Sequence, residues 1–357
     1  MFGAILGDII GSRFEFDRGG WTKEFELFTP KCKFTDDTVM TIAVAEALLK
    51  AREDATVNEI EKACIGSMQK WGRKYPRAGY GGRFIEWLFN EDPKPYDSWG
   101  NGSAMRVSAA GRLYDTLERT REVARATANV SHNHPEGLKG AECTATVIFM
   151  ARTGVSKDEI IDYVIKEFGY DTSKSVDELR PFHRHDESCM DALPKALVSF
   201  FEGDSFEDVI RNAISLGGDT DTIAAIAGAM AEGMYGVPEE LKLECLNRLP
   251  DEMKYVLDDF YDKCVPTAAR IRPFIDARDK EERARIIEML ENDGFILREE
   301  AVRTKQEIIE AVLPLMVNMK DKNYDMMGNT TCAAAAYSSG ALMGADDFCR
   351  YYKKTVG

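Results

Sequence analysis

The sequence predicts an all-α protein, because apolar residues recur at a spacing of three and four while strand-like alternation is scarce. Seven segments show this helical period: residues 39–50, 57–71, 119–127, 137–152, 191–201, 206–215 and 222–235. The loops between them are rich in Gly, Asn, Asp and Ser, and functional residues are expected in loops that a rigid scaffold positions. We therefore expect a compact orthogonal bundle of many helices with functional loops.

The length and texture of the chain predict one large domain and an appendage. With 357 residues, of which 44% are hydrophobic, the chain can bury a large core. Beyond about residue 266 the texture changes to a charge-rich segment, residues 270–303, whose charges are typical of solvated helix faces. We expect a helical domain over residues 1–266 and a C-terminal helical appendage of unknown role over residues 267–357.

Charge and cysteine usage exclude several classes of protein. The net charge of −15 argues against binding a phosphate backbone, which usually requires a basic surface. The N-terminal apolar run is broken by Asp8, Arg13 and Glu15, so it does not predict a signal peptide. No stretch approaches the roughly 20 apolar residues that span a bilayer. The eight cysteines are scattered, which indicates reduced thiols and no zinc site. We expect a cytoplasmic protein without a nucleic-acid or membrane partner.

Two of the predicted helices open with an unusual concentration of carboxylates and hydroxyls. Residues 34–38 are Phe-Thr-Asp-Asp-Thr, and residues 217–222 are Gly-Gly-Asp-Thr-Asp-Thr. One Asp or Thr is enough to cap a helix, so capping alone does not explain two carboxylates at each start. Like charges are costly to pack together unless a cation lies between them, and hard divalent ions prefer carboxylate and hydroxyl oxygens. These segments favour a metal cleft formed by loops and helix N-termini.

Five motifs follow one another in a recognisable order. They are residues 3–15 (Gly-Ala-Ile-Leu-Gly-Asp-Ile-Ile-Gly-Ser-Arg-Phe-Glu), 34–38, 100–106 (Gly-Asn-Gly-Ser-Ala-Met-Arg), 131–132 (Ser-His) and 217–222. Each motif alone is weak, but the five in order over roughly residues 1–266 are a specific match. On these motifs the sequence resembles the ADP-ribosylglycohydrolase family, whose members remove ADP-ribose from modified targets.

The resemblance implies two Mg²⁺ or Mn²⁺ ions and a set of side chains that hold them. Carried over position by position, the metal ligands are Thr35, Asp36, Asp37, Asp219, Asp221 and Thr222. Two such ions about 3.5–4 Å apart can share a carboxylate and orient a substrate. Glu15 matches a family glutamate implicated in gating or in handling the catalytic water. Asp8 lies in an apolar segment and needs a partner if it is buried, so we expect it to support the ligands from behind or to anchor the structure.

The resemblance also implies where a substrate binds. Residues 96–106 are similar to the family's diphosphate and ribose loop, with expected contacts from Ser98, Trp99, Gly100, Asn101 and Gly102. Glycine there lets backbone N–H groups approach phosphate oxygens, and an aromatic ring can stack on the ligand.

Three further residues are expected beside the same ligand. Gly79 and Gly81 are in a segment that lies near the distal ribose or the leaving group in relatives, and His132 matches a family histidine near the phosphates. His134 is expected to be structural, since magnesium prefers oxygen ligands to histidine nitrogen.

The implied reaction is hydrolysis of an N- or O-glycosidic bond at the anomeric carbon of the distal ribose. Metal ions would fix the sugar, and Asp36, Asp37 or Glu15 would take a proton from the attacking water. The sequence does not decide among these three carboxylates. The expected partner is an ADP-ribosylated protein or small molecule, with an arginine linkage as the first hypothesis and a serine linkage or a small metabolite as alternatives. The sequence carries no signal for the oligomeric state.

Two other interpretations remain open from the sequence. A magnesium phosphatase of the haloacid dehalogenase type is suggested in part by Asp219 and Asp221, but that motif follows an apolar strand and here Gly217 and Gly218 precede it. A non-catalytic protein that binds ADP-ribose would be expected to lose metal ligands. All six positions are intact, which favours an enzyme.

Overall fold

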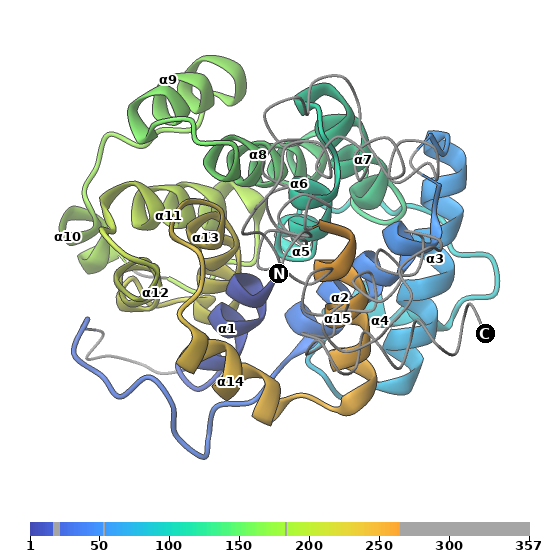
Figure 1. The fold of residues 1–357 in the computed structure, drawn as a ribbon, viewed down its shortest axis with the longest axis horizontal. Coiled ribbons are helices and arrows are strands. Elements are labelled where there is room, and N and C mark those ends of the chain that lie inside the picture. The colour runs from blue at the N-terminus through green and yellow to red at the C-terminus, as the bar shows by residue number, and fades with distance from the viewer. Residues whose placement is uncertain (17–21, 53, 183, 265–357) are drawn as a thin grey trace, which may run out of the picture. The chain divides into compact units, whose positions relative to one another are not determined.

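Helices are the regular structure of the part of the chain that the structure describes. The computed structural model describes residues 1–264 apart from residues 17–21, 53 and 183. In this part of the chain there are fifteen α-helices and two short 3-10 helices and no strand (Figure 1). The all-α prediction is therefore confirmed.

One compact unit contains every predicted site residue. This unit spans Met1–Leu257. The domain boundary expected at residue 266 stays a prediction, and the appendage expected over residues 267–357 lies outside the described residues.

The helix boundaries agree with the periodicity of the sequence. The α-helices are α1 Phe2–Gly11, α2 Asp36–Lys50, α3 Val57–Lys74, α4 Gly82–Phe89, α5 Gly102–Met105, α6 Ala110–Leu113, α7 Leu117–Asn129, α8 Pro135–Arg152, α9 Lys157–Phe168, α10 Val176–Leu179, α11 Cys189–Glu202, α12 Phe206–Ser215, α13 Thr220–Tyr235, α14 Glu239–Arg248 and α15 Asp251–Cys264. The 3-10 helices are Val107–Ala109 and Arg180–Phe182. All seven segments predicted to be helical lie within α2, α3, α7, α8, α11, α12 and α13.

Helix α1 packs against α13 at a distance that only glycine permits. A Cβ atom added at Gly7 would lie 2.1 Å from the carbonyl oxygen of Ala224, and one at Gly11 would lie 2.6 Å from the Cα atom of Asp221. All ten residues of α1 are buried. The close packing therefore brings the C-terminal end of α1 beside the acidic start of α13.

Helix α2 also runs through the interior. Its N-cap is Thr35, and residues 37–45 are all buried, as expected for a helix that is covered on every side. It packs against α3, which begins with a capping box between Thr56 and Glu59. The acidic residues at the start of α2 are thus fixed to the core.

The structure also bears on membrane-spanning segments and on the cysteines of the described residues. None of their helices combines the length and the hydropathy needed to cross a bilayer. The six described cysteines form no disulfide bond.

Candidate metal and substrate site

The two acidic helix starts, far apart in the sequence, meet in the fold. The hydroxyl of Thr222 on α13 donates a hydrogen bond of 3.1 Å to Oδ2 of Asp37 on α2. The side chains of Thr35, Asp37, Asp219, Asp221 and Thr222 are buried. The structure therefore brings five of the six expected metal ligands into one buried region, and the sixth, Asp36, is half-buried at the same helix start.

The carboxylates form two groups that share one member. One oxygen each of Asp8, Asp37 and Asp221 lie within 4.8 Å of one another, and the same holds for Glu15, Asp219 and Asp221. Asp221 belongs to both groups. Two groups of carboxylates joined by a common residue are the arrangement expected of a site for a pair of cations.

Helix capping accounts for little of this arrangement. Thr35 caps α2, since its hydroxyl accepts a hydrogen bond from the backbone N–H of Asp37. Asp219 stands at the N-cap position of α13, but its carboxylate makes no capping hydrogen bond. It accepts one of 2.6 Å from Nδ2 of Asn101 instead. The carboxylate at the start of α13 is thus oriented by a distant loop and remains available to a ligand.

Asp8 holds the start of α2 from behind. Its carboxylate accepts hydrogen bonds from the backbone N–H groups of Thr35 and Thr38, at 2.9 and 3.0 Å, and from both threonine hydroxyls. Because the hydroxyl proton of Thr35 is committed to Asp8 and one lone pair of its oxygen accepts from the N–H of Asp37, one lone pair is left for a cation. Burial raises the pKa of Asp8 to about 6, against the lowering effect of these hydrogen bonds.

The electrostatics of the cluster favour a bound cation. Burial, followed by neighbouring carboxylates, raises the pKa of Glu15 to about 7 and that of Asp36 to about 8. Burial and like charges also hold the pKa values of Asp37 and Asp221 well above their usual range. Among the described residues, no lysine or arginine forms an ion pair with any carboxylate of the two groups or with Asp36. Packing these acids together is therefore costly without a cation.

An orphaned atom supports the same conclusion. Oδ1 of Asp37 is buried and has no hydrogen-bond partner among the described residues. A buried carboxylate oxygen without a donor is expensive unless a cation binds it. The surrounding donor atoms are all carboxylate or hydroxyl oxygens, so the residues present fit a hard divalent ion such as Mg²⁺ or Mn²⁺.

The loop between α3 and α4 borders the start of α2. The backbone N–H of Asp36 donates to the carbonyl of Ala78 at 3.0 Å. Gly79 has a φ of +119°, and a Cβ atom there would lie 3.1 Å from Oδ1 of Asp36. Gly79 is therefore beside the acidic cluster. Gly81 is the N-cap of α4, and a Cβ atom added there would meet nothing within 4 Å.

The expected phosphate loop lies between two other segments. The backbone N–H of Tyr96 donates to the carbonyl of Ser131 at 3.2 Å, and that of Asn101 donates to the carbonyl of Glu187 at 2.8 Å. The backbone N–H of Cys189 in turn donates to the carbonyl of Trp99 at 3.0 Å. Residues 96–101 are thus fixed on both sides, and the side chain of Asn101 connects them to Asp219.

His132 is buried against the glycines of this loop. Cβ atoms added at Gly102 and Gly100 would lie 3.1 and 3.4 Å from its Nε2 atom, while its Nδ1 atom is 2.8 Å from the hydroxyl of Ser131. Burial, and then the charge of Arg106, hold the pKa of His132 well below its usual range, so the imidazole is neutral.

The other expected contacts in this loop differ in their surroundings. The hydroxyl of Ser98 accepts a hydrogen bond of 3.2 Å from the backbone N–H of Gly100. Trp99 is 48% exposed, and its ring meets His134 edge-on at 5.5 Å. His134 itself caps α8, since its Nδ1 atom accepts from the backbone N–H of Glu136 at 3.2 Å. Its role is therefore structural, as the sequence led us to expect.

Sequence reasoning missed one residue near the cluster, His185. Its ring lies 5.8 Å from that of Phe16, and its Nε2 atom lies 3.2 Å from Oε1 of Glu187. Burial lowers the pKa of His185, but the hydrogen bond to Glu187 and the charge of Asp219 outweigh this effect and raise it. No spacing in the sequence marks this histidine, because Phe16 and Asp219 belong to segments that are far away in the sequence.

The fold excludes the phosphatase interpretation. A haloacid dehalogenase motif requires a strand directly before the first Asp. Here α12 ends at Ser215 and α13 begins at Thr220, and only a short glycine-containing turn lies between these helices. Asp219 therefore belongs to a helix start and not to the end of a strand.

These observations define a class of protein: an all-α protein in which two acidic helix N-termini converge on a set of shared carboxylates. The sequence model of the ADP-ribosylglycohydrolase family matches residues 1–270, and the chain belongs to this family. The resemblance seen in the motifs is thereby confirmed, and the chain is an enzyme of the hydrolase class.

Individual relatives are similar over most of the chain. ADP-ribosylhydrolase ARH3 of Mus musculus is 27% identical over 323 residues, which cover 69% of this chain and 86% of that protein. ADP-ribosylarginine hydrolase Tri1 of Pseudomonas putida (strain GB-1) is 25% identical over 278 residues, which cover 66% of this chain and 70% of that protein. A solved structure described as an ADP-ribosylglycohydrolase-related protein complex matches with a TM-score of 0.54 and 23% identity, covering 74% of this chain and 97% of that one. The last similarity supports the fold.

Proposed function

We propose that this protein is a metal-dependent ADP-ribosylhydrolase that cleaves the glycosidic bond between ADP-ribose and an acceptor. The observation that carries the proposal is the pair of largely buried carboxylate groups that share Asp221 and form no ion pair with a lysine or arginine among the described residues. Bound cations would relieve the repulsion within such a cluster. Family membership supplies the expected substrate.

The residues proposed to hold two Mg²⁺ or Mn²⁺ ions are Thr35, Asp36, Asp37, Asp219, Asp221 and Thr222. When bound, the ions would fix the hydroxyls of the distal ribose and orient the sugar for attack by water. Asp8 supports this set by holding the start of α2, and Asn101 supports it by orienting Asp219. Asp8 and Asn101 are proposed to act on the metal ligands and not to bind the ions themselves.

The proposed substrate contacts follow from the loop geometry. The neutral imidazole of His132 faces Gly100 and Gly102, where backbone N–H groups can approach a diphosphate. The exposed ring of Trp99 offers a flat apolar surface at the same loop. Gly79 leaves room beside Asp36 for a ribose or the leaving group. Ser98 holds the turn, and Gly81 faces open space at the start of α4.

We assign the general base to Glu15. Asp36 and Asp37 lie at the start of α2 in ligand positions, whereas Glu15 follows α1 and approaches the cluster from the side of Asp219 and Asp221. In the proposed reaction the water oxygen forms a bond to the anomeric carbon, the bond from that carbon to the acceptor breaks with its electron pair on the acceptor atom, and the water proton passes to Glu15, which then gives it to the acceptor. The two carboxylates of α2 then hold the ions throughout.

The acceptor is proposed to be linked through arginine. This choice is supported by the similarity to ADP-ribosylarginine hydrolase Tri1. A serine linkage or a small ADP-ribosylated metabolite is the alternative. The proposed setting is the cytoplasm, and the proposed partner is an ADP-ribosylated protein or small molecule.

The experiment that tests the function is release of ADP-ribose from arginine-, serine- and nucleotide-linked substrates with Mg²⁺, with Mn²⁺ and with EDTA. We expect metal-dependent release from the arginine-linked substrate, and loss of both release and metal binding when Asp36→Asn and Asp221→Asn are combined. Tight metal-dependent binding of ADP-ribose without turnover of any substrate would point to a binding protein instead. Release that is equally fast in EDTA would overturn the metal assignment.

A further inference from the structure

The segment that carries Glu15 is tied to α12 through a second segment, residues 22–26, which we call the strap. In the strap, residues 23 and 25 are half-buried and residues 22, 24 and 26 are exposed, so alternate side chains face the protein. The strap has no secondary structure that would hold it in place. Its position must therefore come from contacts with neighbouring elements.

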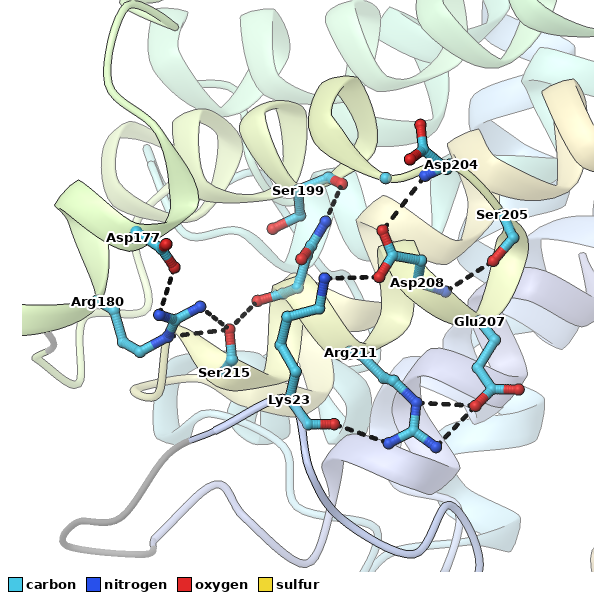
Figure 2. Close-up of polar contacts among 12 residues, drawn as sticks. Lys23, Asp177, Arg180, Ser199, Asp204, Ser205, Glu207, Asp208, Arg211 and Ser215 are labelled. Carbon is cyan, nitrogen blue, oxygen red and sulfur yellow. Dashed lines mark hydrogen bonds and ion pairs between the residues drawn. The ribbon is translucent and has the colours of Figure 1, made fainter.

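Two residues of α12 contact the strap: Asp208 forms an ion pair of 2.6 Å with Nζ of Lys23, and Arg211 binds the backbone of the strap. The Nη1 atom of Arg211 donates a hydrogen bond of 2.8 Å to the backbone carbonyl of Lys23 (Figure 2) and another of 2.8 Å to the backbone carbonyl of Phe25. Its guanidinium also lies over the ring of Phe25, 4.9 Å from the centroid. Glu207, one turn earlier on α12, accepts from Nε at 2.8 Å and fixes the guanidinium plane. One arginine therefore binds the strap through its backbone and through a ring.

The strap in turn binds the residues next to Glu15. The ring of Phe25 meets that of Phe14 edge-on with centroids 5.0 Å apart. Arg13 donates to the backbone carbonyl of Glu26, and its guanidinium lies 4.2 Å from the centroid of the Phe14 ring. Both residues immediately before Glu15 are thus held by the strap.

The same helix also leads to the other side of the cluster. Helix α12 ends at Ser215 and the chain then passes to Asp219, whose carboxylate lies with those of Glu15 and Asp221. Arg211 therefore ties the Glu15 segment to the element that precedes its partner carboxylate. A shift of the strap along α12 would therefore change the distance between the carboxylates of Glu15 and Asp219.

From these contacts we infer that Arg211 is a positioning residue for Glu15, acting through the strap and through Phe14 and Arg13. The inference rests on the proposed function, in which Glu15 takes the proton from water. Arginine is required because its planar group donates to two carbonyls, a carboxylate and a ring face at once, whereas lysine provides a single point charge. The contact concerns the placement of the base and leaves the metal ligands and the substrate loop untouched.

The chain offers a matched control for this arginine. Arg73 on α3 also donates to two backbone carbonyls, those of Leu88 at 2.8 Å and Asn90 at 3.3 Å, and its guanidinium lies 6.0 Å from the centroid of the Phe89 ring. These contacts are at the C-terminal end of α4, away from the cluster. Arg73→Lys therefore removes the same kind of interaction without touching the strap.

The test compares Arg211→Lys with Arg73→Lys, each in the full chain and each with and without Glu15→Gln. In the presence of Mg²⁺ we expect Arg211→Lys to lower kcat for ADP-ribose release by ~10-fold with less than ~2-fold change in KM. In the Glu15→Gln background the same substitution should cause no further loss, because its effect passes through Glu15. Arg73→Lys should stay within ~2-fold of the parent in both backgrounds.

A second readout does not depend on turnover. Trypsin cleavage after Lys23 should be faster in Arg211→Lys than in the parent and in Arg73→Lys, since the carbonyl of Lys23 is released. If Arg211→Lys fails to fold, Phe14→Leu removes the next contact in the series and should give a smaller loss of kcat with the same dependence on Glu15.

The outcomes separate the inference from the proposed function. Equal losses with and without Glu15→Gln would show that Arg211 acts elsewhere and would overturn the inference, and so would unchanged cleavage after Lys23. Faster cleavage with unchanged kcat would overturn the link to Glu15 while leaving the enzyme assignment intact. If the parent protein released no ADP-ribose from any substrate, the proposed function would fail and the role of Glu15 as base would fail with it.

Discussion

The start of α2 is held from inside the core, whereas the segment that carries Glu15 is held from the surface. Asp8, which is fully buried, accepts four hydrogen bonds from Thr35 and Thr38. Glu15 follows α1 in a half-buried segment whose neighbours are held by the strap and by Arg211. The ligand positions therefore gain their geometry from groups that water cannot reach. The proposed base gains its geometry from contacts that are partly exposed and easier to shift.

The largest effect is expected where the core support is removed. Asp8→Ala would leave two backbone N–H groups and two hydroxyls at the start of α2 without partners. Since each unsatisfied buried group costs about 1–3 kcal/mol, we expect the free energy of unfolding in EDTA to fall by about 3 kcal/mol or more. Urea unfolding followed by circular dichroism measures this change.

Asp8→Asn serves as the graded control, because the amide keeps one acceptor oxygen and turns an NH₂ group toward a donor. Its loss should be smaller than that of Asp8→Ala, and Mg²⁺ should bind more weakly in both variants. An alanine variant as stable as the parent would show that the start of α2 does not depend on Asp8.

The next effect is expected at the carboxylate that the two groups share. Asp221→Asn should reduce metal-dependent turnover by at least ~100-fold. In EDTA the same variant should have a higher Tm than the parent, because the like charges of Asp37, Asp219 and Glu15 around Asp221 are relieved. Thermal unfolding and calorimetric titration with Mg²⁺ measure the two changes.

A matched control is Asp251→Asn, which changes an exposed aspartate in the first turn of α15 that is paired with Lys254. This variant should keep full Mg²⁺ affinity and should not gain stability. A lower Tm in EDTA for Asp221→Asn would contradict the view that the cluster is under electrostatic strain without metal.

The third prediction concerns pH. Burial first, and then neighbouring carboxylates, raise the folded-state pKa of Glu15 to about 7 and that of Asp36 to about 8, above the usual carboxyl values near 4. Between the usual carboxyl pKa and these raised values, the folded metal-free protein binds more protons than the unfolded chain, so its free energy of unfolding falls as the pH rises. Mg²⁺ replaces the protons and removes this loss.

The difference in Tm between Mg²⁺ and EDTA should therefore grow between pH 6 and pH 8.5, by about 3 °C or more. Differential scanning calorimetry at the two pH values measures it. In Asp221→Asn the growth with pH should be smaller. A difference in Tm that shrinks as the pH rises would contradict the assignment of the cluster as a cation site.

The sequence was sufficient for the parts of the molecule that are encoded locally. Seven helices follow from apolar spacing, and the acidic starts of α2 and α13 stand out because each places its carboxylates within a few residues. Helix α1 was not predicted: it is short, and three of its ten residues are glycines, which have a low helix propensity. Its helical form follows from packing against α13.

The contacts that organise the site could not be predicted in the same way. Asn101 orients Asp219 across 118 positions of sequence, and Thr222 meets Asp37 across 185. Arg211 binds carbonyls that are 188 and 186 positions away, and a carbonyl has no side-chain signal at all. Motif order identified the family, but the supporting residues are visible only when the chain is folded.

The smallest effect is expected at a residue whose backbone is held while its side chain is not. The carbonyl of Trp99 is fixed by Cys189, but the ring is 48% exposed and meets only the edge of His134. Trp99→Ala should therefore leave the fold and the acidic cluster unchanged.

The binding of ADP-ribose tests whether the ring stacks on the ligand. If it does, its loss should weaken ADP-ribose binding by ~10-fold, because an aromatic contact contributes about 1–1.5 kcal/mol. Trp99→Phe should restore most of the affinity, and calorimetric titration with ADP-ribose in Mg²⁺ measures both. Equal affinities for the parent and the alanine variant would place the ligand away from this ring. Only the start of α2 and the segment that carries Glu15 would then remain as parts of the site.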